Sequence, residues 1–564
     1  MNLFNYLFLR LKGILRPVKL IGQLASMFFV LFLAGCGGKL WTTEEEFFQP
    51  DFGGAVFGDE PRAVLEGNKV LARGGSAADA ATAMYFALSA TLPSAASLGG
   101  GGACLISNPA VKKEERKIEA LEFYNNPAGV NRNSFERSSI PGNVSGIYAL
   151  HSRYGILRWS EMVSAGERLA RFGAPVSKAL SKSIARVPRL FPKTSDLDNM
   201  FNPSNGSIRA GKIWTQRELA NVLANIRTKG PAGFYQGIYG KRFVDGVNAK
   251  GGKLSVRDLR SYKPRWVEPL KIKIGKKFMS RTNAYFLPPP SAAGLYEARI
   301  LGMLSRLSLF PNKNLGSIYN GLADAQLVAY NNQNKKFNGK ERFNWPVNRS
   351  IFEAELNRMR ASLTKLKSDI KAPAEPSENK QINKYFSTSF VAVDEFGMAV
   401  ACGFTMDGEF GSGNIATGTG IIIASNQNSS IERPILIGPM MILNVFSDQF
   451  YLAAATSHGY EGVSALTTTA ARIYLNDESL ESSLAAPRLH YNLTDNITYI
   501  EPSLNNLISE GLARHGYNVR ASRLPLGLVN IVYCSGGIPK DSGTCAVEHD
   551  PRGHGLSVIG ALEE

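Results

Sequence analysis

Blocks of like charge, long apolar runs and metal-binding patterns are all scarce in this chain of 564 residues. Lysine and arginine number 64 against 47 acidic residues, a formal charge of +17, but the excess is spread thinly and indicates no nucleic-acid-binding tail. The mean hydropathy of −0.11 excludes a polytopic membrane protein. Hydrophobic residues make up 44 % and charged residues 20 %, which excludes a wholly disordered or fibrous chain. The six histidines are scattered without metal-ligand spacing, so the sequence predicts no metal site and no cofactor.

Cysteine is rare, with five residues in the whole chain. Cys104 and Cys402 lie in apolar runs and are interpreted as small buried hydrophobic residues. Cys534 and Cys545 flank a turn-rich loop between two strand-like segments. In an oxidising compartment, this second pair is predicted to form a disulfide.

The fifth cysteine ends the only long apolar run. Residues 1–35 carry four basic residues and no acidic one, and their apolar stretch over 20–34 is short for a membrane span. The run ends in Leu33-Ala34-Gly35-Cys36, which is similar to a bacterial lipobox, with Gly37 typical of lipoproteins sent to the outer membrane. We therefore predict a signal peptide over 1–35, lipidation of Cys36, and a lipid-anchored protein on the periplasmic face of the cell envelope. An ordinary signal peptide or N-terminal anchor with a chance cysteine is the alternative.

The residue pattern of the chain changes from helical to strand-like at a polar segment over 368–384. This segment holds two prolines and many polar residues, and it is interpreted as an exposed linker. Helical patterns dominate over 145–310, whereas alternating apolar and small residues predict strands after the linker, through Ala455. Strands, glycine-rich turns and helices together predict sheets covered by helices.

A β-hairpin is predicted directly after the linker. Its strands include 390–393 and 398–402, and a three-residue loop ends at Gly397. Counting outward from this loop places Ser387 opposite Thr405, with Cβ atoms about 4.5–5.5 Å apart, within reach of a hydroxyl–hydroxyl hydrogen bond. A linker that delivers a hydroxyl onto a strand beside a second hydroxyl suits a self-cleaving N-terminal nucleophile. Serine and threonine also populate strand ends without any such function.

Short motifs rich in small residues recur in a fixed order along nearly the whole mature chain. They include Gly-Gly-Ser-Ala-Ala-Asp-Ala-Ala (74–81), Leu-Gly-Gly-Gly-Gly-Ala (98–103), Pro-Gly-Asn-Val-Ser-Gly (141–146), Gly-Phe-Tyr-Gln-Gly (233–237), Gly-Gly-Lys-Leu-Ser-Val-Arg-Asp-Leu (251–259), Val-Asp-Glu-Phe-Gly-Met-Ala-Val (393–400) and Phe-Gly-Ser-Gly (410–413). In this order and spacing, the chain resembles the gamma-glutamyltransferase family.

The resemblance implies an α+β fold of the N-terminal-nucleophile hydrolase type, a four-layer αββα sandwich. In this family, a hydroxyl residue attacks the preceding carbonyl, and hydrolysis of the resulting ester cuts the protein into a large and a small chain that stay associated. Here the cut would fall before Ser387, with the large-chain region over 36–386 and the small-chain region over 387–564. The freed Ser387 would then act as nucleophile with its own α-amine as base. A shift by one residue would make Thr388 the nucleophile.

The resemblance also assigns groups around the nucleophile. Thr405 matches the threonine that hydrogen-bonds the nucleophile in the family. Gly459 and Tyr460 match the two glycines whose amides form the oxyanion hole. Because the second residue is tyrosine here, its amide keeps its place only if the backbone dihedrals are unchanged.

The donor pocket departs from the family pattern. The arginine that binds the substrate α-carboxylate falls at Tyr124, and the serine pair that supports it falls at Leu436 and Ile437. The position that binds the substrate amine falls near Ser429, and its polar companions fall at Asp407 and Asn426. Loss of the arginine and serines removes charged hydrogen bonds of about 1.5–3 kcal/mol each.

These residues predict an acyl hydrolase or transferase that acts on a small-molecule amide donor, with water or an amino acid as acceptor. The donor is a γ-glutamyl compound such as glutathione or, given the lost clamp, a less charged acyl amide. The alternative is a catalytically degenerate lipoprotein that keeps the fold as a binding or scaffold module.

Overall fold

A computed structural model describes most of the chain. The described residues are 52–109, 117–127, 138–190, 192, 195–202, 208–274, 282–306, 314–331, 386–425, 434–444 and 446–561, with a few isolated positions between 354 and 367. The predicted signal peptide, Cys36 and the linker over 368–384 lie outside the described residues.

The largest sheet in the described part of the chain has seven antiparallel strands in the order β22-β1-β11-β12-β2-β3-β8. Their bounds are β1 Phe52–Gly58, β2 Gly101–Asn108, β3 Lys117–Phe123, β8 Arg265–Val267, β11 Ser387–Val393, β12 Ala399–Thr405 and β22 Leu556–Ala561. The predicted hairpin, β11 and β12, therefore lies in the interior of the sheet rather than at an edge.

A second antiparallel sheet has the order β21-β20-β16-β15-β10-β9. Its strands are β9 Leu270–Lys273, β10 Asn283–Phe286, β15 Met440–Asn444, β16 Gln449–Ser457, β20 Leu528–Ile538 and β21 Cys545–Val547. The helical interpretation of 145–310 missed β8, β9 and β10. These strands are three or four residues long, too short for a clear alternating pattern.

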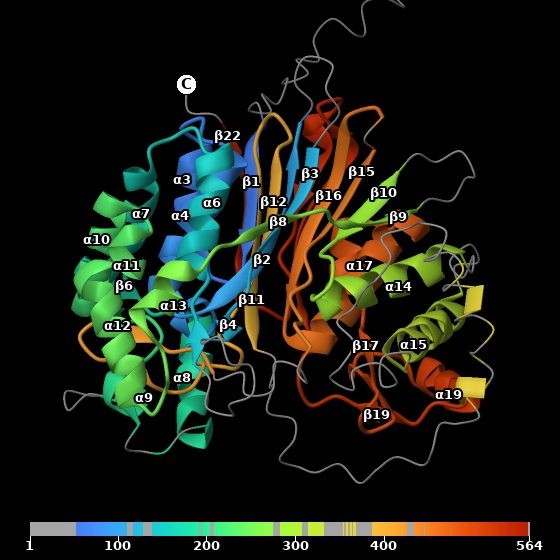
Figure 1. The fold of residues 1–564 in the computed structure, drawn as a ribbon. Helices are drawn as coiled ribbons and strands as arrows, with labels where there is room; N and C mark the ends of the chain where they lie inside the picture. Colours follow the sequence, from blue (N-terminus) through green and yellow to red (C-terminus); the bar gives the residue numbers. More distant parts are fainter. Residues whose placement is uncertain are drawn as a thin grey trace, which may run out of the picture. The chain divides into compact units, whose positions relative to one another are not determined.

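Helices cover the outer face of each sheet (Figure 1). On the first sheet, α3 packs on β1, α4 packs on β11 and β12, and α7 and α10 lie behind them; on the second, α14 and α17 pack on the strands and α15 packs on α14. The bounds of these helices are α3 Pro61–Leu71, α4 Ala77–Thr91, α7 Trp159–Phe172, α10 Arg217–Lys229, α14 Ala292–Arg306, α15 Leu315–Asn331 and α17 Gly459–Asn476. One apolar cluster lies between the sheets and one lies under each helix layer. The predicted four-layer αββα sandwich is confirmed.

The other elements connect and flank these layers. They are α5 Pro93–Ala96, α6 Asn143–Tyr154, α8 Lys178–Leu190, α9 Asp196–Phe201, α11 Ala232–Tyr235, α12 Gly237–Ala249, α13 Val256–Ser261, α18 Leu480–Ala485, α19 Asn506–Arg514, β4 Asn126–Pro127, β5 Ser139–Ile140, β6 Ala174–Pro175, β7 Ile213–Trp214, β13 Ile415–Ala416, β14 Ile421–Ile422, β17 Leu489–Asn492, β18 Ile497–Ile500 and β19 Val519–Ala521. No helix in the described part of the chain is long and apolar enough to cross a membrane.

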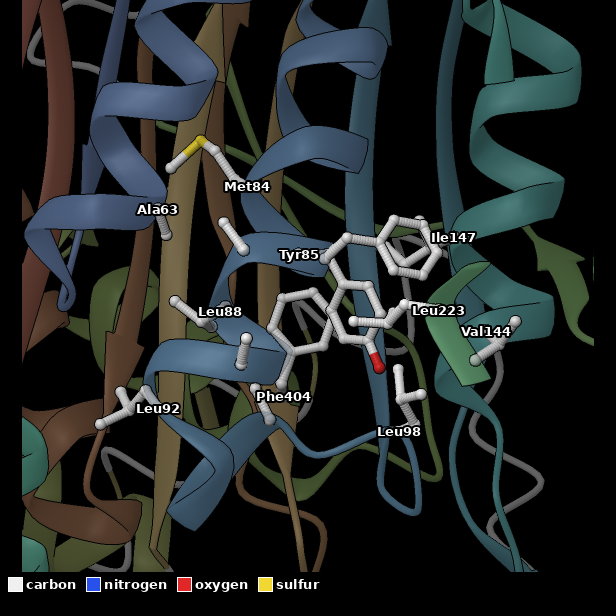
Figure 2. Packing of buried hydrophobic residues seen from close by; sticks show 14 of the residues in the cluster. Ala63, Met84, Tyr85, Leu88, Leu92, Leu98, Val144, Ile147, Leu223 and Phe404 are labelled. Carbon is white, nitrogen blue, oxygen red and sulfur yellow. The ribbon is translucent and has the colours of Figure 1, made fainter. Parts of the chain in front are cut away.

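The alanine-rich helix α4 supports the predicted hairpin from behind. Ser76 and Asp79 form a capping box at its start, and every residue of the helix is buried. The ring of Tyr85 lies 5.1 Å from that of Phe404 on β12 (Figure 2). Because side chains alternate along a strand, this contact to Phe404 leaves the next residue, Thr405, facing the other side of the sheet.

The hairpin has the predicted register. Ser387 pairs with Thr405, Gly397 has φ +81°, and the amide of Asp394 donates to the carbonyl of Met398 at 3.0 Å. The turn residue with positive φ is a glycine, which adopts this conformation without steric cost.

Both cysteine pairs in the described residues form disulfides. The predicted bond joins Cys534 to Cys545. The interpretation of Cys104 and Cys402 as unpaired hydrophobic residues was wrong, because they are bonded to each other. They are fully buried as expected, but they lie directly opposite each other on β2 and β12, a pairing that only the strand order of the sheet brings about.

Candidate active site

Ser387 is the first residue of β11, at the end of the sheet, and only 4 % of its surface is exposed. By strand alternation, it shares a face with Val391 and Val393, which belong to the core between the two sheets. The amide of His458 donates a hydrogen bond of 3.1 Å to the Ser387 hydroxyl oxygen. The residue between β16 and α17 thus reaches the hydroxyl that the sequence predicts as the nucleophile.

Thr405 contacts the peptide group in front of Ser387. Its hydroxyl donates to the carbonyl oxygen of Phe386 at 2.9 Å and accepts from the amide of Asp407, also at 2.9 Å. The sequence predicts a hydroxyl–hydroxyl bond to Ser387 instead. The register is right, but a hydroxyl has one proton to donate, and here it goes to the carbonyl. This contact polarises the carbonyl that Ser387 would attack.

Thr388 lies in a buried polar network that the sequence analysis missed. Its hydroxyl and the amide of Ser389 donate to one carboxylate oxygen of Asp59, at 2.9 Å and 3.0 Å, and the amide group of Asn530 donates to the other oxygen at 2.9 Å. Burial raises the pKa of Asp59, and these hydrogen bonds partly offset the rise. The only sequence signal is an acidic residue directly after an apolar strand. Thr388 faces the opposite side of the strand from Ser387. As a nucleophile it would attack the carbonyl of Ser387, but in this structure its hydroxyl donates to Asp59.

Gly459 and Tyr460 form the first turn of α17. Gly459 has φ +67° and the preceding His458 has φ +77°, whereas Tyr460 is not among the residues with positive φ. The first N–H groups of a helix have no acceptor within the helix and carry its positive dipole end, which suits binding of a developing oxyanion. The Tyr460 ring packs 5.6 Å from Tyr296 and 5.5 Å from Tyr330, inside the outer helix layer. A tyrosine at this position therefore needs no strained backbone.

His458 is a second residue that sequence reasoning missed. Its Nδ1 lies 3.0 Å from the hydroxyl of Ser457, and its ring packs edge-on against Phe386 at 5.5 Å. Burial lowers the pKa of His458 to about 4, so the imidazole is neutral at pH 7. It therefore adds no positive charge beside Ser387, and the fixed donor at this point is its backbone amide.

A series of hydrogen-bonded, buried polar side chains packs against the first turn of α17. The hydroxyl of Tyr330 donates to the carbonyl of Tyr460 at 3.3 Å and lies 2.8 Å from the hydroxyl of Ser464. Ser464 in turn lies 2.9 Å from Nδ1 of His490, whose pKa burial lowers to about 3. Helices α15 and α17 and strand β17 thus meet at the turn that presents the Gly459 and Tyr460 amides.

Four of the six predicted donor-pocket residues, Tyr124, Asp407, Leu436 and Ile437, lie in the described part of the chain. Asp407 accepts from the side-chain amide of Asn125 at 2.9 Å and contacts Thr405 through its own amide. Tyr124 precedes Asn125 and packs against the core between the sheets, where burial raises the pKa of its hydroxyl well above the ordinary value. Asn426 and Ser429 lie outside the described residues.

The two residues that match the family's serine pair face different cores. Ile437 belongs to the core between the sheets and packs so closely on Gly403 that a Cβ would not fit there. Leu436 belongs to the core under the second helix layer. The two side chains thus pack in different cores of the structure. Among described groups of His, Cys, Asp and Glu, no set of three or more could hold a metal ion.

Comparison with known proteins agrees with this geometry. The sequence model of the Gamma-glutamyltranspeptidase family matches residues 63–559. The chain is similar to the glutathione hydrolase proenzyme of Pseudomonas aeruginosa, with 24 % identity over 545 residues that cover 90 % of this chain and 94 % of that protein. It is also similar to the glutathione hydrolase proenzyme of Bacillus subtilis, with 24 % identity over 564 residues that cover 91 % and 93 %.

A solved structure shares the fold. Cephalosporin acylase from Bacillus halodurans superposes with a TM-score of 0.73 at 20 % identity, covering 90 % of this chain and 96 % of that one. The two proteins therefore share one fold over most of their length.

Proposed function

Because this chain belongs to the gamma-glutamyltranspeptidase family, we propose that it is an acyl hydrolase or transferase that cuts itself before Ser387 and then uses Ser387 as its nucleophile. The observation that carries the proposal is the pair of hydrogen bonds around one peptide group. Thr405 donates to the Phe386 carbonyl, and the His458 amide donates to the Ser387 hydroxyl. The Ser387 hydroxyl and the Phe386 carbonyl that it would attack are thus each fixed by a hydrogen bond.

The proposed cut follows from this arrangement. The Ser387 oxygen attacks the Phe386 carbonyl carbon, the C–N bond breaks as the ester forms, and the serine nitrogen takes up the proton. Water then hydrolyses the ester, which leaves a carboxylate on Phe386 and restores the Ser387 hydroxyl beside the α-amine that the first step freed. Both curated relatives named above are called proenzymes, which supports such a maturation step.

Turnover would use the same groups on a second carbonyl. The freed α-amine takes the proton of the Ser387 hydroxyl, which attacks an amide donor, and the amides at the start of α17 stabilise the developing oxyanion. Water or an amino acid then resolves the acyl-enzyme. Near Thr405, the family's arginine is replaced by Tyr124 and one serine by Ile437, so we propose a donor without a free α-carboxylate at that point.

The test of this proposal is intact mass with N-terminal sequencing of the mature protein. A small chain that begins at Ser387 supports the proposed nucleophile, and a small chain that begins at Thr388 would transfer the role to Thr388. An uncut protein would favour the second candidate, a scaffold that keeps the fold without catalysis, which the apolar Leu436 and Ile437 also suit.

We expect Tyr330→Phe to lower the catalytic rate without weakening substrate binding. Tyr330 positions the first turn of α17 and does not itself reach the reacting atoms. Its loss should reduce kcat by about tenfold, less than the roughly 100- to 1,000-fold cost of removing a direct oxyanion donor. The measurement is initial rate against donor concentration, and KM should stay unchanged.

Tyr319→Phe is the matched control for this prediction. Tyr319 lies on the same helix, is equally buried, and donates to a backbone carbonyl, that of Pro487, at 2.7 Å. Each variant removes one buried hydroxyl, and both should lose thermal stability. An equal fall of kcat in both variants would assign Tyr330 a purely structural role.

We also propose that Cys36 carries the lipid anchor. Two or more acyl chains hold a protein stably on a membrane, whereas one chain does not. Cys36→Ser should move the protein to the soluble fraction or leave unprocessed precursor, while Cys545→Ser should not change the fractionation. The measurement is membrane fractionation with a labelled fatty acid. A wild-type protein without label, fractionating like the variant, would contradict the anchor.

A further inference from the structure

The disulfide between Cys104 and Cys402 lies in the middle of the first sheet. The two residues are directly opposed on the neighbouring strands β2 and β12, with Cα atoms 4.1 Å apart, and both are fully buried. They are 298 residues apart in sequence. The bond therefore connects two distant parts of the chain through adjacent strands.

The two cysteines of this bond lie on opposite sides of the proposed cut in the sequence. Cys104 lies in the region before Phe386, and Cys402 lies 15 residues after Ser387. The second disulfide, between Cys534 and Cys545, lies wholly after Ser387. Only the first bond spans the two products of the cut.

We propose that the mature protein is a disulfide-linked heterodimer in which the Cys104–Cys402 bond holds the small chain on the large chain after the peptide bond is cut. This inference rests on the proposed cut before Ser387. The small chain carries Ser387, Thr405 and the α17 amides, whereas Tyr124 and Asn125 belong to the large chain. The bond keeps both halves of the site on one covalent molecule.

The chemistry of the bond is an ordinary dithiol oxidation. Two thiols lose two protons and two electrons and form one S–S bond. The acceptor is a protein disulfide of the oxidising compartment, which is reduced to its own dithiol. Because both cysteines are fully buried once the sheet has formed, the oxidation precedes or accompanies formation of the sheet. The later peptide cut consumes one water and leaves the S–S bond unchanged.

Electrophoresis of the wild-type protein tests the proposal directly. The full chain is exported to an oxidising compartment, its free thiols are blocked with N-ethylmaleimide, and it is denatured with and without dithiothreitol. We expect one species of full mature mass without reductant, and two with it, the smaller having 564 − 386 = 178 residues. Two separate chains without reductant would overturn the inference while leaving the cut intact.

A single species under both conditions would mean that no cut occurs, and the proposed maturation would fail. The disulfide itself is then decided by mass spectrometry of a non-reduced digest. A peptide pair joined through Cys104 and Cys402 would keep the bond as a cross-link of the uncut chain, and free alkylated cysteines would overturn it. The two failures are thus distinguished in one sample.

Paired variants sharpen the result. Cys104→Ser with Cys402→Ser should release the small chain without reductant, a complete loss of the linked species. Cys534→Ser with Cys545→Ser removes the other disulfide and should leave the chains linked. Release in this second variant would contradict the assignment of the link to the first sheet. If the first double variant does not fold, the wild-type gel and digest still decide.

Discussion

Ser387→Ala should yield one uncut chain with no detectable turnover. The substitution removes the oxygen that attacks the Phe386 carbonyl and leaves the rest of β11 in place. The lost hydrogen bond from the His458 amide should cost only about 0.5–1.5 kcal/mol of the free energy of unfolding. The loss of cleavage is therefore separable from a loss of folding. The measurements are denaturing electrophoresis after reduction and thermal unfolding of the same preparation.

Thr388→Val is the matched control, because it removes the neighbouring hydroxyl and keeps the side-chain shape. It deprives Asp59 of one donor and should destabilise the fold by about 1–3 kcal/mol, yet the cut should still occur before Ser387. Thr405→Val should leave Ser387 in place and slow the cut, since the Phe386 carbonyl loses its donor.

A Ser387→Ala protein that is still cut at the same bond would show that another protease makes the cut.

The wild type should handle glutathione and γ-glutamyl anilides poorly, and Tyr124→Arg with Ile437→Ser should improve kcat/KM for them. A free α-carboxylate beside Tyr124 and Ile437 would lose water without gaining a charged partner. Charged hydrogen bonds of about 1.5–3 kcal/mol correspond to a gain of roughly 10- to 100-fold in kcat/KM. Either single substitution should do little, because the two groups share one carboxylate.

The structure supplies a sharp control for this experiment. Tyr124→Arg with Leu436→Ser places the serine one residue away, where the side chain faces the outer helix layer. This variant should gain nothing and should lose stability. The readout is initial rate against donor concentration for both pairs. A wild type as efficient with glutathione as ordinary family members would contradict the altered pocket. A restored variant that is cut but inert would instead indicate a defective oxyanion hole and favour the scaffold.

Local sequence patterns were sufficient to predict the register of the β11–β12 hairpin. One glycine at the turn and a residue count outward from the loop predicted that Ser387 lies opposite Thr405, and the structure has this register. The same patterns did not predict where the Thr405 proton goes. That choice depends on the orientation of the Phe386 carbonyl, which no residue type encodes.

The groups that the sequence analysis missed come from distant segments. Asp59 and Asn530 meet at β11 although they are 471 residues apart, and Cys104 meets Cys402 only because β2 is the neighbour of β12. Leu436 and Ile437 were matched to one pocket, yet they face different cores. None of these relations has a local pattern from which it could have been predicted.

The sequence by itself determined the family, the layered fold and the hairpin register. These follow from motif order, from strand alternation and from residue identity, all of which are local properties of the chain. Only the tertiary structure decided that Thr405 contacts the Phe386 carbonyl, that Asp59 holds Thr388, and that a disulfide spans the proposed cut. Each of these depends on which strands become neighbours, and strand order is set by burial of the whole core rather than by any single segment.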